Sequence, residues 1–221
     1  MNEPTARQPS QRQRARKARI LQQARAIIGE KGIEGLTMRE LAASSGVALA
    51  TLYNLYGSKE TLVGIAINDF FEPIVAQASA KSASKSPLKR LLLLVDEITA
   101  NVLGAEAYAR VVVSLYYSSD AAPEVHGMLY SLARKEFAGI MSEMESQQGL
   151  HDWVATGLVA DEMAHQIMAR IHQWCRGDIS DAQLSPLMKY GALQILAGAC
   201  DGALSQAVTK ELKMLTRRLA C

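Results

Sequence analysis

Residues 37–61 bring together side chains that can contact nucleic acid, on two short predicted helices joined by a tight turn. Thr37, with Glu40 three residues later, forms a capping-box pattern and predicts that the first helix begins here. Gly46 supplies the conformational freedom that a tight turn between helices requires. This layout is typical of a helix-turn-helix, whose second helix enters the major groove of DNA.

The second helix of this segment is expected to separate an inner from an outer face. Val47, Leu52 and Tyr56 face inward, whereas the aromatic side chain of Tyr53 is left outside beside polar neighbours. Hydroxyl, amide and cationic groups around such a helix bond to phosphates, and a few side chains at its start read base edges. A plain helical hairpin in an all-α core is the alternative. It does not explain the outward tyrosine or the cationic Lys59 at the next helix start.

Residues from about Ile20 to Leu62 resemble the N-terminal domain of the TetR family of one-component transcriptional regulators. The matching stretches read ILQQARAII, EKGIEGLTMRELA and GVALATLYNLYGSKETL. The resemblance implies an all-α fold, with a three-helix DNA-binding domain followed by a larger helical domain for effector binding and dimerisation. The implied phosphate contacts are Thr37, Thr51, Tyr53 and Lys59, and the implied base contacts are Arg39, Leu49, Ala50 and Asn54.

Two positions depart from the family's pattern. Residue 48 is usually serine or another capping residue and is alanine here, so the recognition helix lacks a cap worth about 1 kcal/mol. Residue 55 is usually histidine and is leucine here, which removes one phosphate partner. Arg39 is the best candidate for a bidentate contact to guanine. These residues leave the operator sequence open.

Composition favours a helical protein. Of the 221 residues, 49% are hydrophobic and only 5% aromatic, with alanine, leucine and methionine abundant. We find no alternating β-branched run that would indicate a strand. The longest apolar run, 91–95, is too short to cross a bilayer, and the polar, basic N-terminus lacks a signal-peptide core. We therefore expect a cytoplasmic protein with no membrane partner.

Charge is uneven along the chain. Residues 1–60 carry ten Lys/Arg against five Asp/Glu, and the remainder carries 14 against 17, as in a DNA reader with a separate second function. Residues 1–16 are interpreted as a disordered basic arm that contacts phosphates or the minor groove, or alternatively as a solvated tail. The expected domains are the arm (1–16), a helix-turn-helix domain (17–62) and a helical effector-binding and dimerisation domain (63–221).

Glycine, proline and capping residues divide the chain into helices. Gly32 is expected to end the first helix, and Pro73 to kink or end the helix that starts after Ser58. Ser86-Pro87 starts another. Further helices are expected at about 105–118, 123–148, 160–176 and 186–200, and after 202. The helix near 186 has two competing start signals, which are Ser185-Pro186 and the capping pair Ser180 and Gln183.

Neither a metal site nor a catalytic centre is expected. His165 and His172 lie seven residues apart, near one face of a predicted helix, but no HExxH arrangement joins them. The three cysteines contain no CxxC pair. We therefore expect a regulator without a cofactor, not an enzyme. The alternatives are a helical enzyme or ligand-binding protein without DNA function, and a nucleoid-type DNA binder without an effector.

The resemblance further implies an effector pocket in the larger domain and a repressor that releases its operator on binding a small, hydrophobic ligand. Methionine suits adaptable apolar pockets and tyrosine adds a polar group to an apolar ring. Ordinary core packing is the alternative for each such residue. The predicted ligand contacts are Tyr116, Tyr117, Met128, Tyr130, Phe137, Met168 and His172.

Useful DNA affinity requires two heads on a palindromic operator, so the chain is expected to form a homodimer through a self-complementary patch. The best candidates are the helices at 160–176 and 186–200, the second of which is rich in small residues. They would form a four-helix bundle with the partner's copy, unless the small residues only pack inside the monomer. The predicted interface residues are Leu184, Leu187, Met188, Ala192, Ile195 and Leu196.

Overall fold

The computed structural model describes residues 10–82, 84–117 and 123–220. Within these residues the regular structure is helical, apart from an isolated bridge between Leu150 and Cys200. The expected all-α fold is confirmed. The helices are α1 (Gln11–Gly35), α2 (Met38–Ser45), α3 (Leu49–Tyr56), α4 (Lys59–Ser82), α5 (Pro87–Gly104), α6 (Glu106–Tyr116), α7 (Pro123–Ser146), α8 (Thr156–Arg176), α9 (Asp181–Ala197) and α10 (Gly202–Leu219).

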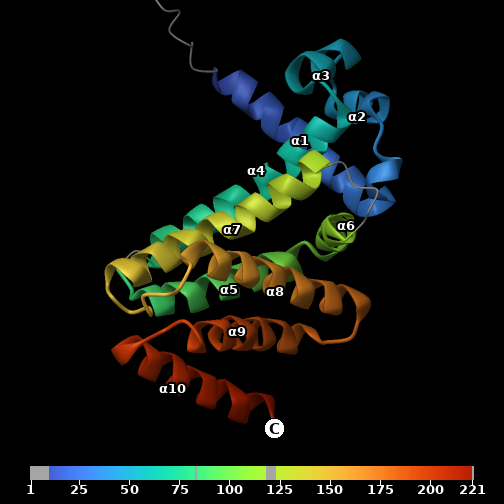
Figure 1. Cartoon of the computed structure of the whole chain (residues 1–221). Helices are drawn as coiled ribbons and strands as arrows, with labels where there is room; N and C mark the ends of the chain where they lie inside the picture. The colour runs from blue at the N-terminus through green and yellow to red at the C-terminus, as the bar shows by residue number, and fades with distance from the viewer. Residues whose placement is uncertain (1–9, 83, 118–122, 221) are drawn as a thin grey trace, which may run out of the picture.

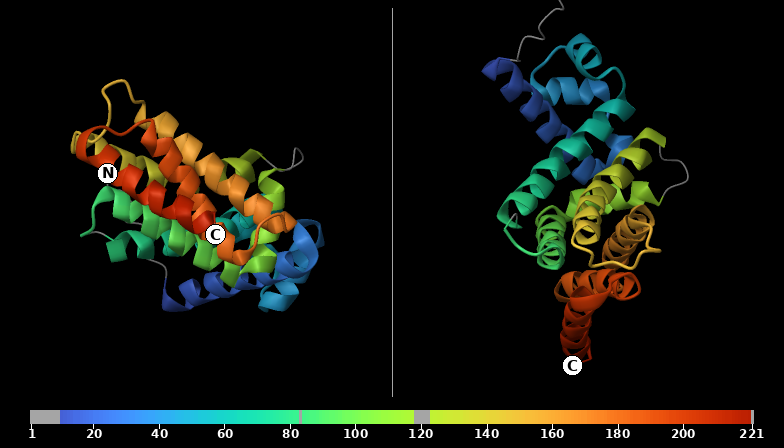
Figure 2. Two further views of the ribbon diagram at one scale, coloured as in Figure 1. Left: turned by 90° about the horizontal axis from the view of Figure 1, so that it is seen from below. Right: turned by 60° about the vertical axis from the view of Figure 1, so that its left-hand side comes forward.

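The helices form a small head and a larger body, which are joined by α4 (Figure 1). Helices α1, α2 and α3 make the head, and α4 leads from it along α5 and α7 into the body. Helices α8, α9 and α10 follow in successive layers. Both views in Figure 2 place α10 on the outside of the body, and the right-hand view places it at the end opposite the head.

The helical spacing of apolar residues explains the core. In the head, Ile20, Leu41, Leu52 and Leu62 are fully buried, each contributed by a different helix. Burying a leucine or isoleucine side chain contributes about 1.5–3 kcal/mol. The buried set continues without a break into the body, where Phe137 is fully buried. Among the described residues, no helix is both long and apolar enough to cross a membrane.

The first helix starts earlier than predicted. It begins at Gln11 instead of Lys17, because Ser10 and Gln13 form a reciprocal capping box. Residues 11–16, expected to belong to a disordered arm, are therefore helical, while 1–9 lie outside the described residues. Gly32 was expected to end the first helix. It has a positive φ of 71° and kinks the chain there, but α1 continues beyond it to Gly35.

Two further boundaries differ from the prediction. Helix α4 does not end at Pro73, one of the two outcomes expected there, but continues to Ser82, because packing against α5 and α7 outweighs the hydrogen bond that proline cannot make. Helix α9 starts at Asp181 because the Ser180–Gln183 capping box forms. Pro186 consequently lies inside α9, so the competing start signal at Ser185-Pro186 is not used.

Candidate nucleic-acid interface

The turn between α2 and α3 has the geometry expected of a helix-turn-helix. The Thr37 hydroxyl accepts a hydrogen bond from the Glu40 backbone N–H at 3.1 Å and caps α2. The Glu40 carboxylate does not complete the predicted capping box but bonds to the Lys31 ammonium at 2.5 Å, which raises the pKa of Lys31. Gly46 adopts the left-handed conformation, with φ 63° and ψ 41°, and ends α2.

Helix α3 has the predicted inner face. Leu52 is fully buried and Tyr56 is 5% exposed, while Val47 is half-buried against the same core. Tyr56 is therefore a core residue, and burial raises the pKa of its phenol. Among the described atoms, its hydroxyl has no hydrogen-bond partner.

The predicted DNA contacts lie around the opposite face, although they are not equally accessible. The side chains of Thr37, Arg39, Ala50, Tyr53 and Asn54 are exposed. Tyr53 keeps 49% of its surface exposed. The remaining predicted contacts, Thr51, Lys59 and Leu49, are half-exposed.

Leu49 is the weakest of these assignments. It is the first residue of α3, and its side chain packs partly against the head core. Only part of it is therefore left for a base edge. An apolar side chain in this place can contact a thymine methyl group but cannot donate or accept a hydrogen bond.

The N-terminus of α3 lacks a side-chain cap, as the sequence predicted. Ala48 occupies the N-cap position with extended backbone and makes no capping hydrogen bond. Ala48→Ser is expected to raise the free energy of unfolding by about 1 kcal/mol, because the hydroxyl would accept a backbone N–H of the first turn of α3. Urea unfolding measures this, with Ala50→Ser as the matched control inside the helix. An equal effect of both substitutions would contradict the capping explanation.

Additional cationic groups lie on the first turns of α1. Arg12, Arg14, Arg16, Lys17 and Arg19 are all exposed there. Figures 1 and 2 show these turns extending toward the same end of the molecule as α3. The sequence indicated basic residues here but not their helical placement, because the capping role of Ser10 was missed.

The predicted effector residues do not form one group. Tyr116, Tyr117 and His172 lie together: the Tyr117 and His172 rings stack with centroids 4.4 Å apart, and Tyr116 meets Tyr117 edge-on at 5.1 Å. Phe137 and Met168 are buried core residues, as the alternative interpretation held. The side chain of Met128 lies outside the described part of the structure.

Tyr130 belongs to a polar cluster between α7 and α8. Hydrogen bonds from Tyr130 and Arg134 to Asp161 lower the pKa of that carboxyl group. The Tyr130 ring centroid lies 5.2 Å from that of His165, whose Nδ1 is 2.9 Å from the Asp161 backbone oxygen. In the part of the chain that the structure describes, no group of three or more potential ligands is arranged to hold a metal ion.

The predicted dimer residues on α9 are mostly not available. Leu184, Met188, Ala192 and Leu196 are fully buried by the chain's own helices, so assigning them to an intermolecular surface was wrong. Leu187 and Ile195 are only half-buried. The apolar face of α9 packs against α5, α8 and α10, and the small residues serve this internal packing.

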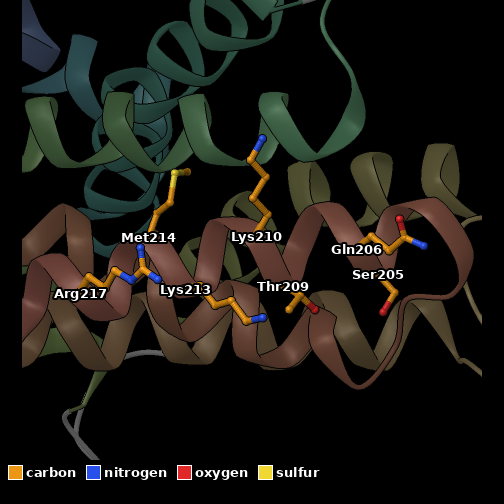
Figure 3. A pocket seen from close by; sticks show the side chains of 7 residues that line it. All are labelled: Ser205, Gln206, Thr209, Lys210, Lys213, Met214 and Arg217. Atoms are coloured by element: carbon orange, nitrogen blue, oxygen red, sulfur yellow. The ribbon is translucent and has the colours of Figure 1, made fainter.

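Helix α10 instead carries open grooves, which the sequence did not indicate. One, of about 500 Å³, follows its outer face past Ser205, Thr209, Lys213 and Arg217 (Figure 3). A second, of about 350 Å³, lies between α9 and α10 and shares Thr209, Lys213 and Arg217 with the first. The amphipathic pattern of α10 was visible, but its packing against α9 was not.

Comparison with known proteins connects this geometry to a family. Residues 20–64 match the model of the bacterial regulatory proteins of the tetR family. The chain is 35% identical over 141 residues to the HTH-type transcriptional repressor KstR of Mycolicibacterium smegmatis, covering 62% of this chain and 68% of that protein. The corresponding KstR of Mycobacterium tuberculosis is 34% identical over 121 residues, 52% of this chain and 54% of that one.

Solved structures share the fold. A TetR-family regulator from a Rhodococcus species has a TM-score of 0.68 at 17% identity, covering 81% of this chain and 97% of its own. FadR of Thermus thermophilus, in complex with lauroyl-CoA, has a TM-score of 0.67 at 16% identity, with 82% and 94% covered. FadR of Bacillus subtilis, in complex with stearoyl-CoA, scores 0.68 at 17%, with 82% and 98% covered. The head geometry, the matched segment and the curated relatives agree: the chain belongs to the TetR family of bacterial transcriptional regulators.

Proposed function

We propose that this protein is a repressor that binds a palindromic DNA operator through the helix-turn-helix and releases it when a small, hydrophobic ligand enters the body. The observation that carries the DNA function is the outer face of α3, where Tyr53 and Asn54 are exposed over a buried inner face. The names of the curated relatives support the repressor role. The matched segment, 20–64, supports a head boundary close to 62.

Specific groups on the head serve different parts of the DNA. Thr37, Thr51, Tyr53 and Lys59 bond to phosphates and set the position of the helix, whereas Arg39 and Asn54 read base edges. Arg39 suits guanine and Asn54 suits adenine, because each offers the paired groups that the base edge requires. Ala50 and the exposed part of Leu49 contact thymine methyl groups.

Two heads are needed on a palindromic site, so we place the dimer contact on the α9–α10 surface. Helix α10 lies on the outside of the body, and Met214 is 49% exposed there. A helix flanked by two grooves suits self-association, because the ridge of one copy can lie in the groove of the other. Lys210 and Met214 extend to one side of α10, and Lys213 extends to the other (Figure 3).

The effector is proposed to enter near Tyr117 and His172. The Tyr117 ring, directly after the end of α6, stacks on the His172 ring of α8, and both are partly exposed beside Tyr116. The polar cluster of Tyr130, Arg134 and Asp161 could bind a polar end of such a ligand. Lauroyl-CoA and stearoyl-CoA are the probes of choice, because two proteins of the same fold hold them.

A single set of measurements tests this proposal. The full chain should retard a duplex from upstream of its own gene, and lauroyl-CoA or stearoyl-CoA should both abolish retardation and raise the melting temperature. At one hundred times the dissociation constant, a ligand stabilises the folded state by about 2.7 kcal/mol. Free coenzyme A is the control for the apolar chain. Retardation that no acyl-CoA reverses would reject these effectors, and absence of retardation would reject the DNA function.

A further inference from the structure

Helix α6 contacts the head on one side and the body on the other. It packs against α1 as well as α8, and Figure 1 shows it beside the head end of the body. Tyr108 and Arg110 are two residues apart, so their side chains point about 200° apart around the helix. Tyr108 contacts the head side and Arg110 contacts α8.

On the head side, Tyr108 packs against the middle of α4. Its ring meets the ring of Phe70 edge-on, with centroids 5.2 Å apart. The guanidinium of Arg25 on α1 lies 5.8 Å from the centroid of Phe70 and bonds to Asp69 at 2.8 Å. Tyr108 is only 6% exposed, and its hydroxyl has no hydrogen-bond partner among the described atoms. Ring packing therefore holds this contact, with no directional bond from the tyrosine.

Helices α1 and α6 also approach closely at Gly29. A Cβ added at this glycine would lie 3.7 Å from the Tyr108 backbone nitrogen and 3.8 Å from the Ala107 Cβ. These are ordinary packing distances, so the two backbones are already separated by little more than one methyl group. A displacement of α6 toward α1 must therefore move α1 as well, because no free space separates the two helices.

On the body side, Arg110 joins α6 to α8. Its guanidinium lies over the Trp174 ring, 4.8 Å from the centroid, and donates to the Cys175 backbone oxygen. Trp174 is 3% exposed, and its Nε1–H donates to the Asp181 carboxylate at 2.7 Å in the first turn of α9. Arg110 thus contacts the residue that connects α8 to α9.

We propose that Arg110 is a positioning residue that couples the α8–α9 pair to the DNA-binding head through α6. This inference rests on the proposed DNA function, because it concerns the effect of DNA binding at the head. Coupling between two sites is reciprocal. DNA binding at α3 must therefore alter the surroundings of Trp174, and a change at the α8–α9 pair must alter DNA affinity.

Intrinsic fluorescence tests this directly. The chain has two tryptophans, and Trp153 is 70% exposed, so Trp153→Phe leaves Trp174 as the single tryptophan. Titrating this variant with the duplex from upstream of its own gene should shift the Trp174 emission, with saturation at the DNA concentration that saturates retardation. Adding Arg110→Met, which keeps the apolar stem but removes the cation and the donors, should abolish the shift while the protein still retards the duplex.

The controls separate the possible failures. Arg176→Met removes an arginine that pairs with Asp178 near the end of α8 and should leave the emission shift intact. Arg110→Lys, which retains the charge, should preserve part of the response and decides the matter if Arg110→Met does not fold. The coupling proposal alone is overturned if the protein retards DNA but the Trp174 emission does not shift. It is also overturned if folded Arg110→Met shows the full emission shift. A protein that retards no DNA overturns the proposed function together with it.

Discussion

Lys59→Ala is expected to weaken binding to every DNA sequence and to lower the salt slope by about one unit for each bound head. Lys59 is the first residue of α4, where the positive end of the helix dipole disfavours a cation. Among the described residues it has no ion-pair partner that would offset this cost. Its position is therefore better explained by a phosphate contact than by stability.

Tyr53→Ala should also weaken binding to every DNA sequence, without changing the charge of the protein. A hydrogen bond to a charged group contributes about 1.5–3 kcal/mol, so each head loses roughly this much affinity when the phenol is removed. Tyr53→Phe distinguishes the hydroxyl from the ring. Retardation at several salt concentrations measures both variants, with the exposed Lys89 of α5 replaced by alanine as the control. Unchanged affinity and slope for Lys59→Ala and Tyr53→Ala would reject the head assignment.

The head was predictable because its signals are local. Thr37 caps α2, Gly46 makes the turn and the uncapped Ala48 precedes α3, and each depends on neighbours within about four residues. Leu52 and Tyr56 followed from helical periodicity alone. Which exposed side chains meet DNA is a property of the complex, and for those the sequence supplied only the family resemblance.

The sequence did not decide the helix boundaries where two local signals competed. Ser180 with Gln183 and Ser185 with Pro186 both mark helix starts. The backbone N–H and the hydroxyl of Ser180 both donate to the Gln183 side-chain oxygen, at 2.9 and 3.0 Å, and this pair sets the start of α9. At Pro73 the helix continues, because packing of α4 against α5 and α7 outweighs the tendency of proline to end a helix. Neither result follows from spacing, because each depends on the free energy of contacts made elsewhere.

The small residues of α9 show why a surface is harder to predict than a helix. Gly191 is buried, and a Cβ there would lie 2.0 Å from the Gln166 side-chain amide nitrogen of α8. Gln166 also donates toward the Leu187 backbone oxygen at 3.5 Å. The absence of a side chain at Gly191 therefore leaves room for a side chain of the same molecule. The sequence cannot distinguish this from close approach by a second copy.

Burial determines the effect expected of a charged substitution on α9. Leu196→Arg would place a cation at a fully buried position, where an unpaired charge is strongly unfavourable. We expect this variant to unfold or to lose several kcal/mol of stability, not to yield a folded monomer. Circular dichroism and urea unfolding report this outcome. A folded, cooperative Leu196→Arg monomer would contradict the packing of α9.

Thr209→Arg is expected to give a folded monomer with much weaker operator binding. Thr209 is exposed and lines both grooves beside α10, so a long cation there blocks self-association without entering the core. Ala169→Arg is the matched variant on the exposed face of α8. The sequence predicted the helix at 160–176 as the other candidate for the interface. The Ala169→Arg protein should remain a dimer. Sedimentation measures the mass of each variant, and retardation measures its affinity for a palindromic duplex. Because a monomer engages only one half-site, it loses the gain that linking two heads provides. A monomeric Ala169→Arg beside a dimeric Thr209→Arg would move the interface from α10 to α8.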